Sequence, residues 1–89
     1  MAYNPDNLSA LTYANGFTLW HYKSTDLAAT IDTTGYFNIA APMLRVGDFI
    51  LANANTGASI ESGVFVVKEN NGTVVDVSNI LGFGLADTD

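Results

Sequence analysis

The chain has 89 residues, of which three are Lys or Arg and nine are Asp or Glu, so its formal net charge is −6. Charged residues make up 13% of the sequence, about half the share in an ordinary soluble domain. Asn, Thr, Ser, Gly and apolar side chains must therefore form most of the surface. Since charge is the usual protection against association, this composition predicts a chain that sits in an assembly.

The same totals exclude several classes of protein. The absence of cysteine rules out disulfides and Cys-ligated metals, and the single histidine, His21, argues against a zinc site. Three separated cations cannot neutralise a run of phosphates, so we expect no nucleic-acid partner, and the acidic balance argues against anionic membranes. No apolar run approaches about 18 residues, so we expect no membrane span. We identify no cofactor site.

The length predicts one small β domain over residues 1–89. Residues 1–16 are expected to form an N-terminal arm, which is either frayed or packed on a neighbouring subunit. The turn residues Asn15-Gly16 end this arm. Residues 1–6 lack the basic and apolar regions of a secretory signal, which favours assembly in the cytoplasm where the chain is made.

Residues 17–23 alternate as a strand does, with Phe17, Leu19 and His21 on one face and Thr18, Trp20 and Tyr22 on the other. Both faces carry bulky groups, so we expect both to be covered. Ser24 and Thr25 are candidate caps for a short helical turn over 26–31, and Asn38 for another through Met43. Tyr36 and Phe37 are expected to return two aromatic rings to the core.

Residues 46–53 are expected to form the next strand, with a bulge or kink at Gly47-Asp48. A polar loop follows over 53–59. The tail, 79–89, begins apolar and ends acidic. Together with the hairpin described next, these elements predict an all-β fold: a small barrel or sandwich of about four to six strands with one or two short helical turns.

A β-hairpin is expected where the runs 63–69 and 73–78 flank Asn71-Gly72, a pair typical of two-residue type I′ turns. This turn pairs Val66 with Val77 and Lys68 with Val75. It gives a core face of Val64, Val66, Val75 and Val77, and a second face with Phe65, Val67 and Val74. A register shifted by one residue exchanges the two faces. The expected interface residues are Phe65, Val67, Val74, Ile80, Leu81, Phe83 and Leu85.

Candidate catalytic motifs are weak. Asp32-Thr33-Thr34-Gly35 is similar to the Asp-Thr-Gly loop of dimeric aspartic proteases, but the extra Thr changes the turn that presents the carboxylate. His21 lies in a strand beside Trp20, where packing explains it better than catalysis. Gly82-Phe83-Gly84 lacks the third glycine of a dinucleotide fingerprint. We therefore predict no enzymatic activity and no catalytic or metal-binding residues.

The aromatic residues allow a different function. Tyr13, Trp20, Tyr22 and Tyr36, with the abundant Asn residues, could stack on and hydrogen-bond a sugar. A domain this small also needs its few large rings for its core, and we favour that interpretation. A tail or receptor-binding component that recognises host surface glycan is therefore the alternative function.

Four segments between Phe17 and Leu51 are similar to a known family: Leu19-Trp20-His21-Tyr22, Thr25-Asp26, Gly35-Tyr36-Phe37-Asn38 and Met43-Leu44-Arg45-Val46-Gly47-Asp48-Phe49-Ile50. They resemble small virion proteins of tailed bacteriophages and gene transfer agents, of the capsid decoration or head-fibre and head-spike base type. The resemblance implies a structural protein on the capsid surface that binds the major capsid protein, as a decoration or cement protein or as a fibre base. It also implies a homo-oligomer, with a trimer favoured, and no catalytic residues.

Overall fold

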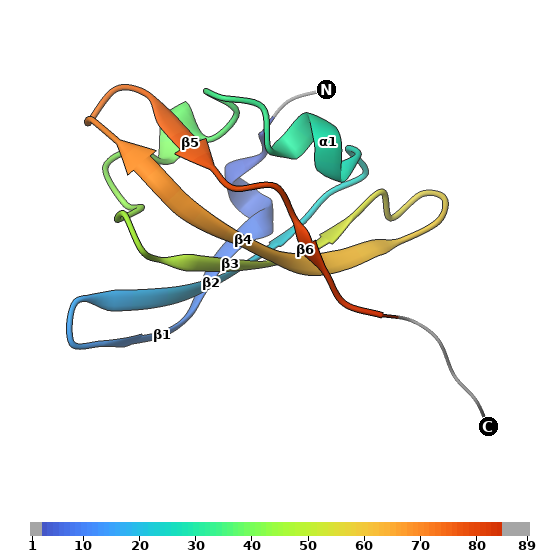
Figure 1. Cartoon of the computed structure of the whole chain (residues 1–89), viewed down its shortest axis with the longest axis horizontal. Helices are drawn as coiled ribbons and strands as arrows, with labels where there is room; N and C mark the ends of the chain where they lie inside the picture. The colour runs from blue at the N-terminus through green and yellow to red at the C-terminus, as the bar shows by residue number, and fades with distance from the viewer. Residues whose placement is uncertain (1–2, 85–89) are drawn as a thin grey trace.

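The computed structural model describes residues 3–84, which form six strands, one short α-helix and two 3₁₀ turns (Figure 1). The strands are β1 (Leu8–Ala14), β2 (Phe17–Lys23), β3 (Phe49–Ala54), β4 (Glu61–Asn70), β5 (Val75–Val77) and β6 (Leu81–Gly82). The helical elements are η1 (Pro5–Asn7), α1 (Ala28–Ile31) and η2 (Asn38–Ala40). The expected small all-β fold is confirmed.

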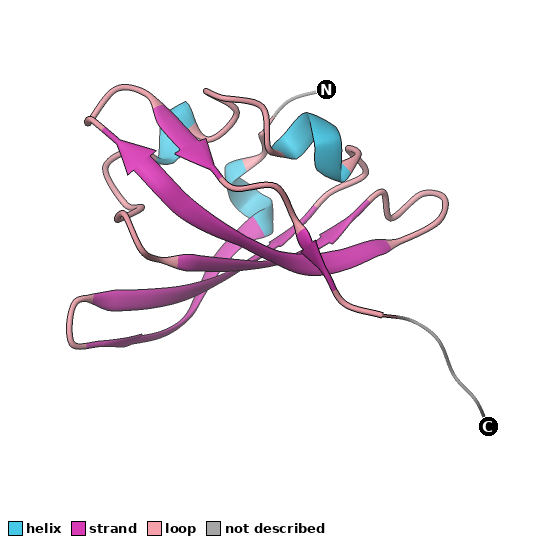
Figure 2. Cartoon of the chain, viewed as in Figure 1, coloured by secondary structure: helices cyan, strands magenta, loops and turns pink. Residues whose placement is uncertain are grey.

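The strands form one mixed sheet in the order β1-β2-β3-β4-β5, with β6 also on β4. Neighbouring strands are antiparallel except β2 and β3, which run parallel. The first half of β4 pairs with β3 and β6, and its last residues pair with β5. Figure 2 shows β4 crossing most of the molecule, so that β5 lies on the same side of the sheet as the helical turns.

The N-terminal segment differs from the expected arm. Residues 8–14 form β1, which pairs antiparallel with β2. Asn15 and Gly16 have φ values of 53° and 77°, the positive values that a two-residue type I′ turn needs. Ahead of β1, Tyr3 is buried and stacks on Tyr22. From Tyr3 onward the segment is therefore part of the domain, with β1 as an edge strand of the sheet.

The inner face of the sheet is covered by a long crossover. A parallel pair of strands cannot be joined by a tight turn, and residues 24–48 supply the connection between β2 and β3. This crossover packs Ile31, Phe37 and Leu44 into the core. Alternate residues of the sheet face it: Thr18, Trp20 and Tyr22 from β2, Ile50, Ala52 and Ala54 from β3, and Phe65 and Val67 from β4.

A buried carboxylate fixes the end of the crossover. The Asp48 side chain is 1% exposed. It accepts hydrogen bonds from Thr18 N–H at 3.0 Å, Trp20 Nε1–H at 3.1 Å and Arg45 N–H at 3.1 Å. Asp48 therefore joins the start of β3 to β2 and to the crossover.

The strand expected over 46–53 begins later, at Phe49, and ends at Ala54. Gly47 has a φ of 96° and lies in a turn in which Asp48 N–H donates to Arg45 O at 3.0 Å. The expected bulge at Gly47-Asp48 is thus a tight turn ahead of β3. This turn aims the Asp48 side chain into the core.

The expected hairpin forms with a longer loop and another register. The observed pairs are Val67 with Val77, Glu69 with Asp76 and Asn70 with Val75, with a bulge between Val67 and Glu69. Residues 71–74 make the loop, where Asn71 Oδ1 accepts from the N–H groups of Thr73 and Val74. The asparagine side chain stabilises this wider loop in place of the two-residue turn.

This register corrects the assignment of faces on β4. Phe65 and Val67, expected on a contact surface, are 0% exposed and lie in the core. Val64 and Val66, expected in the core, are half-buried on the opposite face. The β5 valines are buried as expected. A phenylalanine side chain buries more apolar surface than a valine, which favours the observed arrangement.

Two expected capping residues act elsewhere. Ser24 Oγ accepts from Asp26 N–H at 2.9 Å in the turn before α1, and Glu61 Oε1 from β4 accepts from the first N–H of α1 at 2.9 Å. Asn38 begins η2, but its Oδ1 accepts from Val75 N–H at 2.9 Å. Glu61 and Asn38 thus hold the crossover to β4 and β5, whereas the Ser24 bond lies within the crossover.

We predict that Asp48→Ala lowers the free energy of unfolding by about 3 kcal/mol or more, because three donors in a buried place lose their acceptor. Urea denaturation followed by Trp20 fluorescence measures the change. Asp6→Ala removes the same charge from an exposed turn and should cost less than about 0.5 kcal/mol. Equal losses in the two variants would contradict the role given to Asp48.

Candidate functional site

A directed chain of hydrogen bonds links the N-terminus to the crossover. Asn4 N–H donates to Tyr22 Oη at 3.1 Å, Tyr22 Oη lies 2.9 Å from Tyr36 Oη, and Tyr36 donates to Asp26 Oδ2 at 2.7 Å. Tyr36 has one hydroxyl hydrogen and gives it to Asp26, so Tyr22 must donate to Tyr36. Every hydroxyl in this chain is used, and the chain ends on a carboxylate that is 4% exposed.

The environment of Tyr36 opposes its ionisation. Burial raises the pKa of Tyr36 far above its ordinary value of about 10, and the hydrogen bonds with Tyr22 and Asp26 raise it further. A phenolate at this position would lose its donated hydrogen bond and face the Asp26 carboxylate. Burial also raises the pKa of Tyr3, whose ring stacks on Tyr22. At neutral pH the Tyr36 hydroxyl is a structural hydrogen-bonding group, whereas the buried Tyr3 hydroxyl has no hydrogen-bond partner in the described part of the chain.

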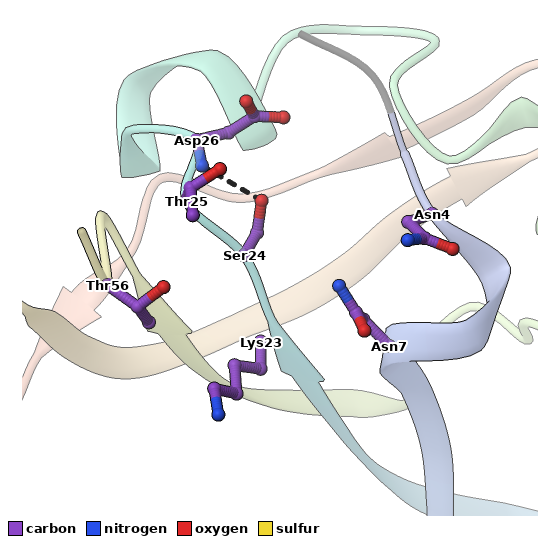
Figure 3. Close-up of a pocket in the computed structure, with 7 residues that line it drawn as sticks. All are labelled: Asn4, Asn7, Lys23, Ser24, Thr25, Asp26 and Thr56. Atoms are coloured by element: carbon purple, nitrogen blue, oxygen red, sulfur yellow. Dashed lines mark hydrogen bonds between the residues drawn. The ribbon is translucent and has the colours of Figure 1, made fainter.

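A polar pocket of about 420 Å³ opens beside this chain of hydrogen bonds (Figure 3). It lies between the N-terminal turn, the end of β2 and the loop after β3, and it is lined by Asn4, Asn7, Lys23, Ser24, Thr25, Asp26 and Thr56. Amide, hydroxyl, carboxylate and ammonium groups can orient a small polar ligand. Of the described residues that line the pocket, none carries an aromatic ring for stacking.

The protease-like segment is a structural turn. Asp32 ends α1, and its N–H donates to Ala28 O at 3.0 Å. Gly35 N–H donates to Val75 O at 2.9 Å, which ties the segment to β5. Within residues 3–84, no three or more His, Cys, Asp or Glu side chains are grouped so as to hold a metal ion.

His21 belongs to a polar line on the sheet. Ser62 Oγ donates to Asn53 Oδ1 at 2.6 Å, and Asn53 Nδ2 donates to His21 Nε2 at 3.1 Å. The line runs across β4, β3 and β2 on the face opposite the crossover. It contains no carboxylate to orient the imidazole as a catalytic triad requires.

The outer face of the sheet is the second candidate site. It is formed by β1, β2, β3, the first half of β4 and β6, and Figure 1 shows the helical turns and β5 on the other side of these strands. Cross-strand pairing places Leu19 beside Phe49 and Leu51 beside Val64. The apolar residues of this outer face are Ala14, Phe17, Leu19, Phe49, Leu51, Val64, Val66 and Leu81.

The outer face is apolar but is covered by no other part of residues 3–84. The rings of Phe17 and Phe49 meet edge-to-face at 5.2 Å, yet Phe49 remains 43% exposed. Leu81, at the β6 side, is 69% exposed. A contiguous apolar surface of this kind is typical of a protein–protein contact.

The expected interface residues fall into four groups. Phe65 and Val67 lie in the core and cannot contact a partner, which corrects their assignment. Val74, Leu81 and Phe83 are exposed, and Ile80 packs partly against the core. Leu85 lies outside the described residues.

Only Leu81 of the apolar residues on the outer face belonged to the expected interface. The seven that were missing from it are Ala14, Phe17, Leu19, Phe49, Leu51, Val64 and Val66. A signal for them was present in the sequence. In residues 17–23 and 49–53, large side chains occupy both alternating positions, so one set faces the core and the other must face something else. The sequence alone does not determine which of the two alternating rows faces the core and which is left uncovered.

The rings expected as an alternative sugar platform do not lie together on the surface. Trp20 and Tyr22 are buried, and Tyr36 is half-buried. The rings of Tyr3, Tyr22, Tyr36 and Phe37 contact one another and form an aromatic cluster. Tyr13 is exposed, with the Arg45 guanidinium 5.7 Å from its ring centre. The core therefore uses the rings that a stacking platform would need.

Comparison of the chain with family models, with curated proteins and with solved structures finds no match. Of the helices in the described part of the chain, none is long and apolar enough to cross a membrane. The fold and its sites define a small β domain with a polar pocket at one end and an uncovered apolar sheet face.

We predict that the wild-type protein loses stability as the pH rises above about 10, since a tyrosine with a raised folded-state pKa stabilises fully only below its unfolded-state pKa. Tyr36→Phe should lose less stability over the same pH range, although it is less stable at pH 7 by about 1 kcal/mol because Asp26 loses a donor. Urea denaturation at stepped pH values measures both effects. Parallel pH slopes for the two proteins would contradict the prediction.

Proposed function

We propose that the chain is a structural protein of a tailed-phage virion that binds the capsid surface as a homo-oligomer, with no catalytic activity. The main observation in support of this proposal is the amount of apolar surface that the chain exposes. Residues 3–84 expose eleven large hydrophobic side chains, although the whole chain has only three cationic and nine acidic residues. These side chains are Leu11, Tyr13, Leu27, Ile39, Met43, Val46, Phe49, Ile60, Val74, Leu81 and Phe83.

The exposed apolar residues occur in separate regions, which suits a subunit with two kinds of neighbour. Phe49 and Leu81 lie on the outer face, whereas Ile39 and Val46 lie on the crossover that covers the opposite face. A capsid-bound oligomer needs one surface for its own copies and another for the major capsid protein. Whether it cements the shell or forms the base of a head fibre, the same two surfaces serve.

Apolar burial is strong enough for this role. It contributes roughly 25 cal/mol for each Å² of apolar surface removed from water. A stable contact buries about 800 Å² on each partner. Several subunits joined in one oligomer would also bind a repeating lattice by avidity. The resemblance of residues 17–51 to small phage virion proteins supports the capsid as the partner, and a trimer as the oligomer.

The polar pocket is the one observation that favours the alternative, a tail or receptor-binding component for surface glycan. Asn4, Asn7, Asp26 and Thr56 supply amide, carboxylate and hydroxyl groups that sugar hydroxyls could bond. The aromatic rings lie in the core and leave the pocket without a stacking surface. We therefore place glycan recognition second.

We predict that the purified protein co-sediments with empty phage heads assembled without it, and that binding saturates at a fixed number of copies per head. The apolar contact should persist at high salt, because salt screens charges and leaves hydrophobic burial intact. Quantitative gel analysis of pelleted heads measures the binding. A chain that ignores heads but binds host cells or polysaccharide would contradict the proposal and favour the alternative.

A further inference from the structure

We infer that the outer face of the sheet is buried against a second copy of this chain. The inference deepens the proposed function, because it rests on the homo-oligomer and assigns a surface to it. It does not depend on capsid binding, which the chain would achieve through another surface. Charge, size and hydrogen bonding on the outer face each support a second copy as the occupant.

The charge on the outer face is the first argument. The chain carries a net charge of −6, yet none of the described residues on this face is acidic. Of the exposed or half-buried acids, Glu61 points to α1, and Asp76 forms a 3.5 Å ion pair with Lys68 on the β4–β5 hairpin. Two acidic copies can thus approach through their outer faces without bringing carboxylates together.

The lack of acidic residues also indicates what kind of partner fits. A partner that carried an acidic or basic patch would have to bury its charges against apolar side chains without compensation, which is costly. An uncharged apolar surface fits without that cost. The apolar rows of the outer face are such a surface, because the cation that shares this face, Lys23, lies at its rim beside Asn53 at the end of β2. The chain therefore supplies its own complement.

The size of the outer face is the second argument. Neighbouring strands lie about 4.8 Å apart and rise about 3.3 Å per residue. Four strands of six or seven residues, extended by the two residues of β6, therefore make a patch about 20 Å on each side. A standard interface buries about 800 Å² per partner. The flat footprint of the outer face, about 400 Å², is roughly half of that area, so exposed side chains at its rim, such as Phe83 after β6, would have to contribute to the contact. Two such faces can pack about 10 Å apart with interdigitating side chains, as sheets do in a sandwich.

The polar line is the third argument. Ser62, Asn53 and His21 satisfy one another within the face. A facing copy can therefore cover them without leaving their bonded groups unpaired, which would otherwise cost free energy.

Phe49→Glu tests the inference, because Phe49 lies on the central strand β3 and is exposed enough for the folded subunit to tolerate a charge. Ile39→Glu is the matched control: it adds the same charge at an exposed residue of the crossover. Leu81→Glu, at the most exposed outer-face position, is a second test variant. Circular dichroism and Trp20 fluorescence confirm that each variant is folded, and sedimentation velocity over a range of concentrations measures association.

We expect the wild type and Ile39→Glu to sediment as the same oligomer. Phe49→Glu should associate on the order of hundredfold more weakly, because a charge would be buried without a partner, and Leu81→Glu should be weakened less. A monomeric wild type, or a folded Phe49→Glu that remains oligomeric, would overturn the inference. Head binding is scored separately. A monomeric wild type whose head binding Phe49→Glu abolishes would assign the face to the capsid. Capsid binding would then stand, and the homo-oligomer of the proposed function would be wrong.

Discussion

The parallel pairing of β2 and β3 is the constraint on which the rest of the structure depends. A parallel pair needs a long connection, and here residues 24–48 provide it. In a chain of 89 residues, this single crossover uses more than a quarter of the sequence. It covers the inner face, and the short β5 and the N-terminal turn complete that layer. The described chain leaves the outer face uncovered for want of further covering elements.

Two buried acids hold the crossover at its ends. Asp26, near its start, accepts the Tyr36 hydroxyl and so joins the aromatic cluster to the N-terminus through Tyr22 and Asn4. Asp48, at its end, gathers donors from β2 and the crossover itself. A carboxylate accepts several hydrogen bonds but is costly to bury without them. These two residues therefore fix the crossover in one position more firmly than apolar packing alone would.

Local patterns predicted the strands better than their faces. The alternation of residues 17–23 and the Asn15-Gly16 turn have local causes, and both are present in the structure. The β4 faces depended on the loop, where the Asn71 side chain bonds two N–H groups and favours four residues over two. The bulge between Val67 and Glu69, which precedes this loop in the chain, sets the register of β5. The Asn71 side-chain bonds set the length of the loop, and donors distant in the sequence allow Asp48 to be buried. Neither kind of interaction produces a periodic pattern in the sequence.

The fold shows where the few charged residues of the chain lie. Asp26 and Asp48 are internal, and Glu61 and Asp76 have partners at α1 and Lys68. The acidic surface is thus unevenly distributed, and the outer face is the region without it. Composition alone suggested association over the exterior as a whole. The structure assigns association to two particular surfaces. The outer face suits a second copy of the chain, and the crossover exposes Ile39 and Val46 on the opposite side, where they can contact a larger assembly. A subunit that used one apolar surface for both partners would have them compete, whereas two opposed surfaces allow both contacts at once.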